Sequence, residues 1–171
     1  KDGGTLDSLW DANMDMLAPG SGLNLLDRRW AIYSRTPSCP PAFVGPDADV
    51  GNSAIAKGCD VRGEVKNSVL SYDTTIGEGA SVAYSVLMPG AVVEPGAVVQ
   101  YAIVGEKCRI GRFAQVGAPP ESAADPDSWG IAVLGPGTVV AEGEVVRPKP
   151  CSTGITGRWK HERHARDYFL L

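Results

Sequence analysis

The histidines and cysteines of this sequence are few, and their spacing does not suit a metal centre. His161 and His164 lie one helical turn apart, but no third ligand is near them and their neighbours are basic. A zinc site needs three or four protein ligands, so we expect no metal there. The cysteines stand far apart without a Cys-x-x-Cys pair, which predicts reduced thiols in a cytoplasmic protein: Cys39, Cys59, Cys108 and Cys151.

The charge balance argues against polyanionic partners. Sixteen Lys and Arg residues oppose twenty Asp and Glu residues, which gives a net charge of -4 over 171 residues. Such a chain has no overall basic field for nucleic acid or an anionic membrane surface. No apolar run reaches the roughly 20 residues that span a bilayer, and the first residues resemble no signal peptide. Because the chain begins at Lys1 rather than Met, we expect it to be part of a longer protein.

An internal repeat organises the middle of the chain. Aliphatic residues recur in steps of six, six and five, which sum to a period of seventeen. The repeat extends backwards through Val44, Val50 and Ile55, with a coil two residues shorter around 61–65. It resumes after an interruption at 118–129. The three coinciding registers are 70/87/104, 76/93/110 and 82/99/116.

This spacing predicts a parallel β-helix. Each six-residue step suits a short strand followed by a turn, so three steps make one triangular coil. Coils stack about 4.8 Å apart, which places the aliphatic residues in three internal columns. Gly and Pro at the corners, such as Pro89-Gly90 and Pro95-Gly96, favour turns. An antiparallel sandwich is the alternative, but a sandwich has no reason to keep one period.

Both flanks suggest helices. Thr5 can cap a helix whose apolar face contains Leu6, Leu9, Trp10, Met14 and Leu17, and Pro19-Gly20 would end it. We expect that face to pack on an end of the β-helix or on a preceding domain. The polar, Pro-rich segment 118–130 is predicted to be a loop that leaves the coil. The tail at 158–171 is basic and weakly amphipathic, and it is either a docked helix or a disordered end.

Several motifs resemble one enzyme family, the bacterial glucose-1-phosphate adenylyltransferases, also called ADP-glucose pyrophosphorylases, including their sister subunits. The similar stretches are Asp2-Gly3-Gly4-Thr5, Ala12-Asn13-Met14-Asp15, Asn24-Leu25-Leu26-Asp27-Arg28 and Pro40-Pro41-Ala42-Phe43-Val44. The likeness covers residues 1 to about 150 in linear order. Differences at Gly3, Leu26 and Ala31 fit a divergent member or a regulatory-type subunit.

The resemblance implies a division of the chain and a function. Residues 1–43 would be a junction helix and extended linker after a nucleotidyltransferase domain that lies outside this chain. Residues 44–150 would be a left-handed β-helix, with the handedness taken from the family, and 151–171 a helical tail. The parent would join ATP to glucose 1-phosphate, giving ADP-glucose for glycogen synthesis, and would assemble as a homotetramer or heterotetramer. We expect these 171 residues to contain no catalytic residue and to be inactive alone.

The same resemblance implies candidate binding residues. Asp2 would help to hold Mg²⁺ against the nucleotide phosphates in the intact enzyme. Its alternative role is that of a carboxylate near a helix start. The residues that would bind a sugar phosphate, AMP or phosphate effector are Arg28, Arg29, Lys107, Arg109, Arg147 and Lys149. Solvated surface charge is the alternative for each of them.

Two other functions share the predicted fold. Hexapeptide acyltransferases use the same coil and commonly employ a His on the β-helix as base. Residues 44–150 contain no His, which argues against that chemistry. A purely structural assembly module without a catalytic partner domain is the other alternative.

Overall fold

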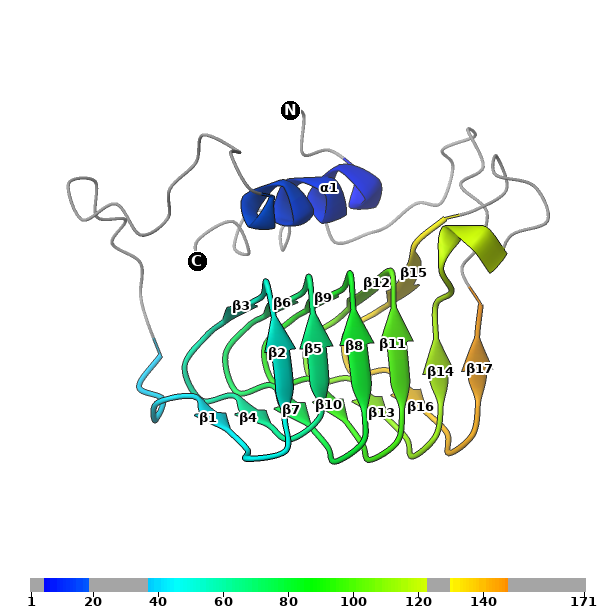
Figure 1. The fold of residues 1–171 in the computed structure, drawn as a ribbon. Helices are drawn as coiled ribbons and strands as arrows, with labels where there is room; N and C mark the ends of the chain where they lie inside the picture. The colour runs from blue at the N-terminus through cyan, green and yellow to red at the C-terminus, as the bar shows by residue number, and fades with distance from the viewer. Residues whose placement is uncertain (1–4, 19–36, 123–129, 148–171) are drawn as a thin grey trace.

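Short parallel strands wind into a three-sided prism in this computed structural model (Figure 1). The structure describes residues 5–18, 37–122 and 130–147. Every third strand of the chain belongs to the same sheet, so three sheets form the three sides. All pairs of neighbouring strands in these sheets are parallel, which excludes the antiparallel sandwich.

The strands are two or three residues long. The first sheet contains β1 (Phe43–Val44), β4 (Asp60–Val61), β7 (Thr75–Ile76), β10 (Val92–Val93), β13 (Arg109–Ile110) and β16 (Val139–Val140). The second contains β2 (Asp49–Gly51), β5 (Glu64–Lys66), β8 (Ser81–Ala83), β11 (Val98–Gln100), β14 (Gln115–Val116) and β17 (Val145–Val146). The third contains β3 (Ala54–Ile55), β6 (Val69–Leu70), β9 (Val86–Leu87), β12 (Ala102–Val104) and β15 (Ala132–Leu134).

The predicted aliphatic columns form the core. Ile76 is in register with Val93, and Val93 with Ile110, in the first sheet. The registers 82/99/116 and 70/87/104 are confirmed in the second and third sheets. All nine of these side chains are 0 or 1% exposed, so the interior is a continuous apolar stack. The predicted left-handed parallel β-helix of hexapeptide type is confirmed.

The corner between the second and third sheets repeats one backbone conformation. Asn52, Asn67, Tyr84 and Tyr101 occupy it, with φ between 42° and 48°. In the middle coils a buried serine follows this residue. The hydroxyl of Ser68 accepts a hydrogen bond from the backbone N–H of Ser85 in the next coil (3.2 Å). Polar atoms inside this corner are therefore paired, as burial requires.

The shortened coil lies where the sequence placed it. Val61 faces the core in the first sheet and Val65 in the second, with Arg62, Gly63 and Glu64 between them. A Cβ added to Gly63 would lie 2.3 Å from the backbone oxygen of Ala80, so only glycine fits this tight corner.

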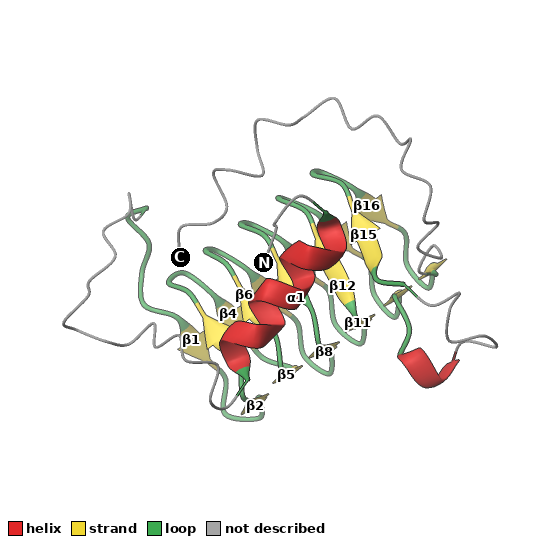
Figure 2. Ribbon diagram, turned by 90° about the horizontal axis from the view of Figure 1, so that it is seen from above, coloured by secondary structure: helices red, strands yellow, loops and turns green. Residues whose placement is uncertain are grey.

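Helix α1 (Leu6–Leu17) begins with the predicted cap, because the hydroxyl of Thr5 accepts a hydrogen bond from the N–H of Ser8. The helix does not pack on an end of the prism. It crosses the strands on the outer face of the third sheet (Figure 2), where Leu9, Trp10, Met14, Met16 and Leu17 contact a buried cluster that includes Val86 and Ile103. The third sheet presents aliphatic residues outward as well as inward, and the helix covers them. Leu6, predicted for the same face, is 41% exposed.

The interruption of the repeat leaves the prism after β14. A short 3-10 turn, η1 (Pro120–Ser122), follows, and Ala132 rejoins the coil through a hydrogen bond to the backbone oxygen of Tyr101. The predicted C-terminal helix at 151–171 lies outside the described residues. No helix among the described segments is long and apolar enough to cross a bilayer.

Candidate functional site

Lys107 and Arg109 are two predicted effector residues that lie on the same coil, two positions apart. Lys107 occupies the corner between the third and first sheets with a φ of 53°, and Arg109 opens β13 two residues later. The Arg109 side chain must point outward, because its neighbour Ile110 points into the core. Both side chains are exposed, so their cations are available to an anionic ligand.

Arg109 already has an ion-pair partner in the adjacent coil. Its Nε atom donates a hydrogen bond to Oε1 of Glu94, 2.7 Å away. The Arg109 side chain is 62% exposed and the Glu94 side chain is 20% exposed. A phosphate that binds Arg109 would therefore compete with a carboxylate that is already in place.

The other predicted binding residues do not join this pair. Arg147 is exposed and follows β17 in the second sheet, on a different side of the prism from Arg109. Asp2, Arg28, Arg29 and Lys149 lie outside the described residues, so their roles stay predictions.

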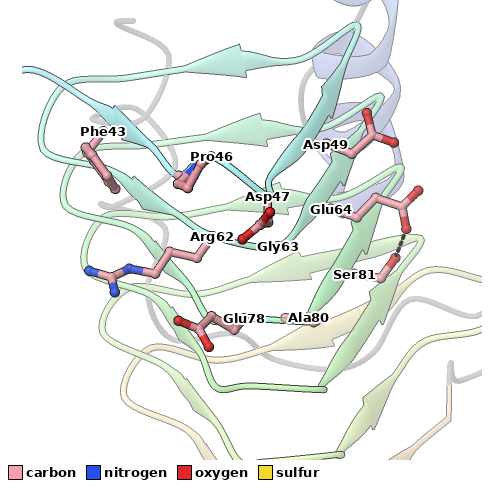
Figure 3. A pocket seen from close by; sticks show the side chains of 12 residues that line it. Phe43, Pro46, Asp47, Asp49, Arg62, Gly63, Glu64, Glu78, Ala80 and Ser81 are labelled. Carbon is pink, nitrogen blue, oxygen red and sulfur yellow. Dashed lines mark hydrogen bonds between the residues drawn. The ribbon is translucent and has the colours of Figure 1, made fainter.

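A recess that was not predicted from the sequence lies at the corner between the first and second sheets. We call it the corner notch (Figure 3); its volume is about 500 Å³. The shortened corner at Arg62 and Gly63 recedes between two full-length corners, 45–48 and 77–80. The sequence signal for this recess is the step of four residues between Val61 and Val65, which replaces the regular step of six. The notch is lined by Phe43, Gly45, Pro46, Asp47, Asp49, Arg62, Gly63, Glu64, Glu78, Gly79, Ala80 and Ser81.

Carboxylates dominate the charge of the notch. Arg62 binds Asp60 through hydrogen bonds of 2.9–3.2 Å, and these raise the pKa of Arg62. Glu64 accepts hydrogen bonds from Lys66 and from Ser81, and both lower the pKa of Glu64, the bond from Lys66 more strongly. Asp47 and Glu78 have no ion-pair partner among the described residues.

No group of three or more His, Cys, Asp or Glu side chains in the described segments could hold a metal ion. The described residues thus offer two charged surfaces: Lys107 with Arg109, and the corner notch. The first suits anions and the second suits cations.

Comparison with known proteins gives one family and a group of relatives. The model of the GlmU-like C-terminal hexapeptide family matches residues 42–141. A glucose-1-phosphate adenylyltransferase of Clostridioides difficile is 48% identical over 92 residues, which cover 54% of this chain and 24% of the relative. The enzyme of the same name from Bacillus mycoides is 50% identical over 91 residues, which cover 53% of this chain and 24% of the relative. The matches thus span about a quarter of the length of these relatives.

A solved structure with a similar coil is that of a histidine-to-asparagine mutant of perosamine N-acetyltransferase from Caulobacter crescentus in complex with CoA and GDP-perosamine. It is 20% identical, with a TM-score of 0.49, and the similarity covers 62% of this chain and 48% of that one.

Proposed function

Because the chain belongs to the GlmU-like C-terminal hexapeptide family, we propose that it is the C-terminal assembly and effector-binding domain of a glucose-1-phosphate adenylyltransferase. The parent enzyme would join ATP to glucose 1-phosphate, with ADP-glucose and pyrophosphate as products for glycogen synthesis. The observation that carries the proposal is the identity of 48–50% over about half of this chain to enzymes of that name.

Catalysis would belong to a preceding nucleotidyltransferase domain, which the motif at Asp2-Gly3-Gly4-Thr5 would join to this chain. Asp2 would help to hold Mg²⁺ against the nucleotide phosphates there, since a hard cation binds carboxylate oxygens. Helix α1 would link the two domains, and its apolar contacts with the third sheet support a rigid junction.

Effector binding would use Lys107 and Arg109 together with basic residues of the linker and the C-terminal segment. A sugar phosphate, AMP or inorganic phosphate presents oxygens that a guanidinium binds in a bidentate manner. Both side chains are exposed on one coil, which supports the proposal. Glu94 would leave Arg109 when the ligand binds, so Glu94 sets the concentration at which the effector acts.

Assembly into a homotetramer or heterotetramer would use exposed apolar residues of the β-helix. Val139 on β16 and Val145 on β17 are 70 and 55% exposed, and Phe113, in the corner between β13 and β14, is 63% exposed. We propose that these exposed apolar side chains are covered in the assembly. A cytoplasmic location belongs to the same proposal, and it is supported by the free thiols of Cys39, Cys59 and Cys108.

The alternative of a hexapeptide acyltransferase lacks a base. Both histidines of the chain, His161 and His164, lie beyond the β-helix. A purely structural module remains the competing function, and turnover by the full-length protein separates it from the proposal.

The experiment is a titration of the full-length protein with fructose 1,6-bisphosphate, AMP and phosphate while pyrophosphate release from ATP and glucose 1-phosphate is measured. We expect at least one effector to change the rate, and Lys107→Gln with Arg109→Gln to weaken that response about tenfold. A matched pair, Lys57→Gln with Arg112→Gln, should leave it unchanged. An effector response that is the same in both double variants would contradict the proposed site.

A further inference from the structure

The corner between the second and third sheets holds two tyrosines in a backbone conformation that suits smaller residues. Tyr84 and Tyr101 each have a φ of 48°, whereas Asn52 and Asn67 occupy the same corner of the first two coils. Asparagine enters this left-handed region more readily than a bulky aromatic residue does. Strain of this kind is typical of functional positions. Here the strained corner carries the contact with helix α1, because the ring of Trp10 lies 6.1 Å from that of Tyr101 and its indole N–H donates to the backbone oxygen of Tyr84.

The two coils that begin with these tyrosines also carry the ion pair of the proposed effector site. Met88 and Ile103 belong to the buried cluster on which α1 packs, where the helix crosses the third sheet (Figure 2). Six positions after Met88 comes Glu94, and six positions after Ile103 comes Arg109. Each coil therefore contacts α1 on the third sheet and contributes one partner of the ion pair on the first sheet.

The two coils are in close contact at the corner that separates these sheets. The backbone N–H of Lys107 donates a hydrogen bond to the backbone oxygen of Pro89, 3.0 Å away, and that of Met88 donates to the oxygen of Val104, 2.9 Å away. A Cβ added to Gly90 would lie 3.3 Å from Cγ of Lys107, so little free space remains between the coils. Close-packed contacts transmit small displacements. A change in the spacing of the two coils at the ion pair is therefore felt at the strands under α1.

We propose that the packing of Trp10 on Tyr84 and Tyr101 couples the effector site to the preceding domain, an inference that rests on the proposed function. The switch is the ion pair: Glu94 holds Arg109 when no ligand is bound, and the phosphate of the effector holds it otherwise. Release of Glu94 removes a side-chain link between the two coils on the first sheet, and this loosens α1 on the third. Thr5, the cap of α1, is also the last residue of the motif that joins the preceding domain. Trp10 is thus a positioning residue that binds neither substrate nor effector.

Asparagine at both corners tests the role of the rings without straining the backbone, because Asn52 and Asn67 already adopt this conformation. In the full-length protein, Tyr84→Asn with Tyr101→Asn should reduce the maximal fold-change in rate that the effector causes by about fivefold, with turnover in its absence kept within about twofold. Tyr84→Phe with Tyr101→Phe keeps the stack and should keep the response. Val99→Ala lowers stability in the core, away from the cluster under α1, and should keep the response as well.

Hydrogen exchange of the peptide Leu6–Leu17 gives a measurement that a purely structural contact would not change. Fructose 1,6-bisphosphate, AMP or phosphate, whichever changes the rate, should speed exchange of this peptide about threefold in the unmodified full-length protein. Glu94→Gln should have the same effect without effector, because it removes the link that the effector breaks. Arg109→Gln should make exchange insensitive to the effector.

The outcomes separate this inference from the proposed function. An effector response that is unchanged in Tyr84→Asn with Tyr101→Asn would overturn the inference, and so would an equal loss of response in Val99→Ala, which would assign the loss to stability. Exchange of Leu6–Leu17 that stays the same when a responsive enzyme binds its effector would also overturn it. A full-length protein that forms no ADP-glucose, or that responds to no effector, would instead refute the proposed function, and this inference with it.

Discussion

The indole Nε1 of Trp10 donates a hydrogen bond to the backbone oxygen of Tyr84, 2.8 Å away. The two residues are 74 positions apart, and the contact fixes helix α1 to the corner where Tyr84 stacks on Tyr101 with ring centroids 4.8 Å apart. The ring of Trp10 lies 6.1 Å from that of Tyr101. Three aromatic residues thus join helix α1 to the β-helix.

This contact predicts that α1 contributes to the stability of the β-helix. Trp10→Ala should lower the free energy of unfolding by about 2–3 kcal/mol, because it removes a half-buried ring and leaves the Tyr84 carbonyl without its donor. Chemical denaturation followed by circular dichroism measures the change. Asp11→Asn, on the exposed side of the same helix, is the control. Equal midpoints for the two variants would show that the helix does not stabilise the third sheet.

The core columns predict that substitutions at two adjacent residues of β7 differ sharply in their effect on the free energy of unfolding. Ile76 is fully buried, whereas Thr75 faces outward on the same strand. Ile76→Ala should cost about 3 kcal/mol through the cavity that it leaves. Thr75→Ala should cost less than about 1 kcal/mol. Comparable losses in urea unfolding would contradict the inward and outward assignment.

The environment of Cys39 predicts its reactivity. Partial burial, the hydrogen bond from Sγ to Oδ2 of Asp73 (3.4 Å) and the charge of Asp73 all raise the pKa of Cys39. A raised pKa means less thiolate at pH 8, so Asp73→Asn should speed alkylation of Cys39 by iodoacetamide about threefold. Asp47→Asn is the control. Peptide mass spectrometry measures each thiol, and an unchanged Cys39 rate in Asp73→Asn would refute the effect.

The thiols of Cys59 and Cys108 should behave differently in the same experiment. Both are 1% exposed, and burial raises the pKa of each. Their raised pKa favours the neutral thiol in the folded state. The resulting stability is complete below the pKa of an unfolded thiol and is lost as pH rises through the folded-state pKa. We expect alkylation of both only after denaturation, and modification in the native protein would contradict the packing.

The pairing of Arg109 with Glu94 predicts a gain of effector sensitivity. Glu94→Gln removes the competing charge but keeps the side-chain volume, so the effector concentration for half-maximal response should fall about threefold to fivefold. Glu142→Gln, an exposed carboxylate at another corner, should have no effect. The measurement uses the full-length protein. A half-maximal concentration that rises in Glu94→Gln would mean that Glu94 helps to form the site.

The periodic part of the fold could be predicted because the spacing of its aliphatic residues along the sequence sets the register of the strands. Val93 lies seventeen residues after Ile76, and one coil of the prism also takes seventeen residues, so the count alone aligns them. The same count located the short coil between Val61 and Val65, although the recess it creates was not inferred.

Contacts without a period could not be predicted in this way. The apolar stripe of α1 indicates which helix face is covered, but nothing local specifies that Trp10 meets Tyr84. The pairing of Arg109 with Glu94 was missed for a related reason. The residues are fifteen positions apart, two short of the repeat, and join only because long side chains reach diagonally across neighbouring coils.

The most direct test of the central claim is the formation of ADP-glucose and pyrophosphate from ATP and glucose 1-phosphate, measured in parallel for the full-length protein and for these 171 residues. We predict turnover by the full-length protein and none by the 171-residue chain, because the nucleotidyltransferase chemistry would lie in the preceding domain. Turnover by the 171 residues alone, or a folded full-length protein that forms no ADP-glucose but transfers an acyl group from acyl-CoA, would contradict the account.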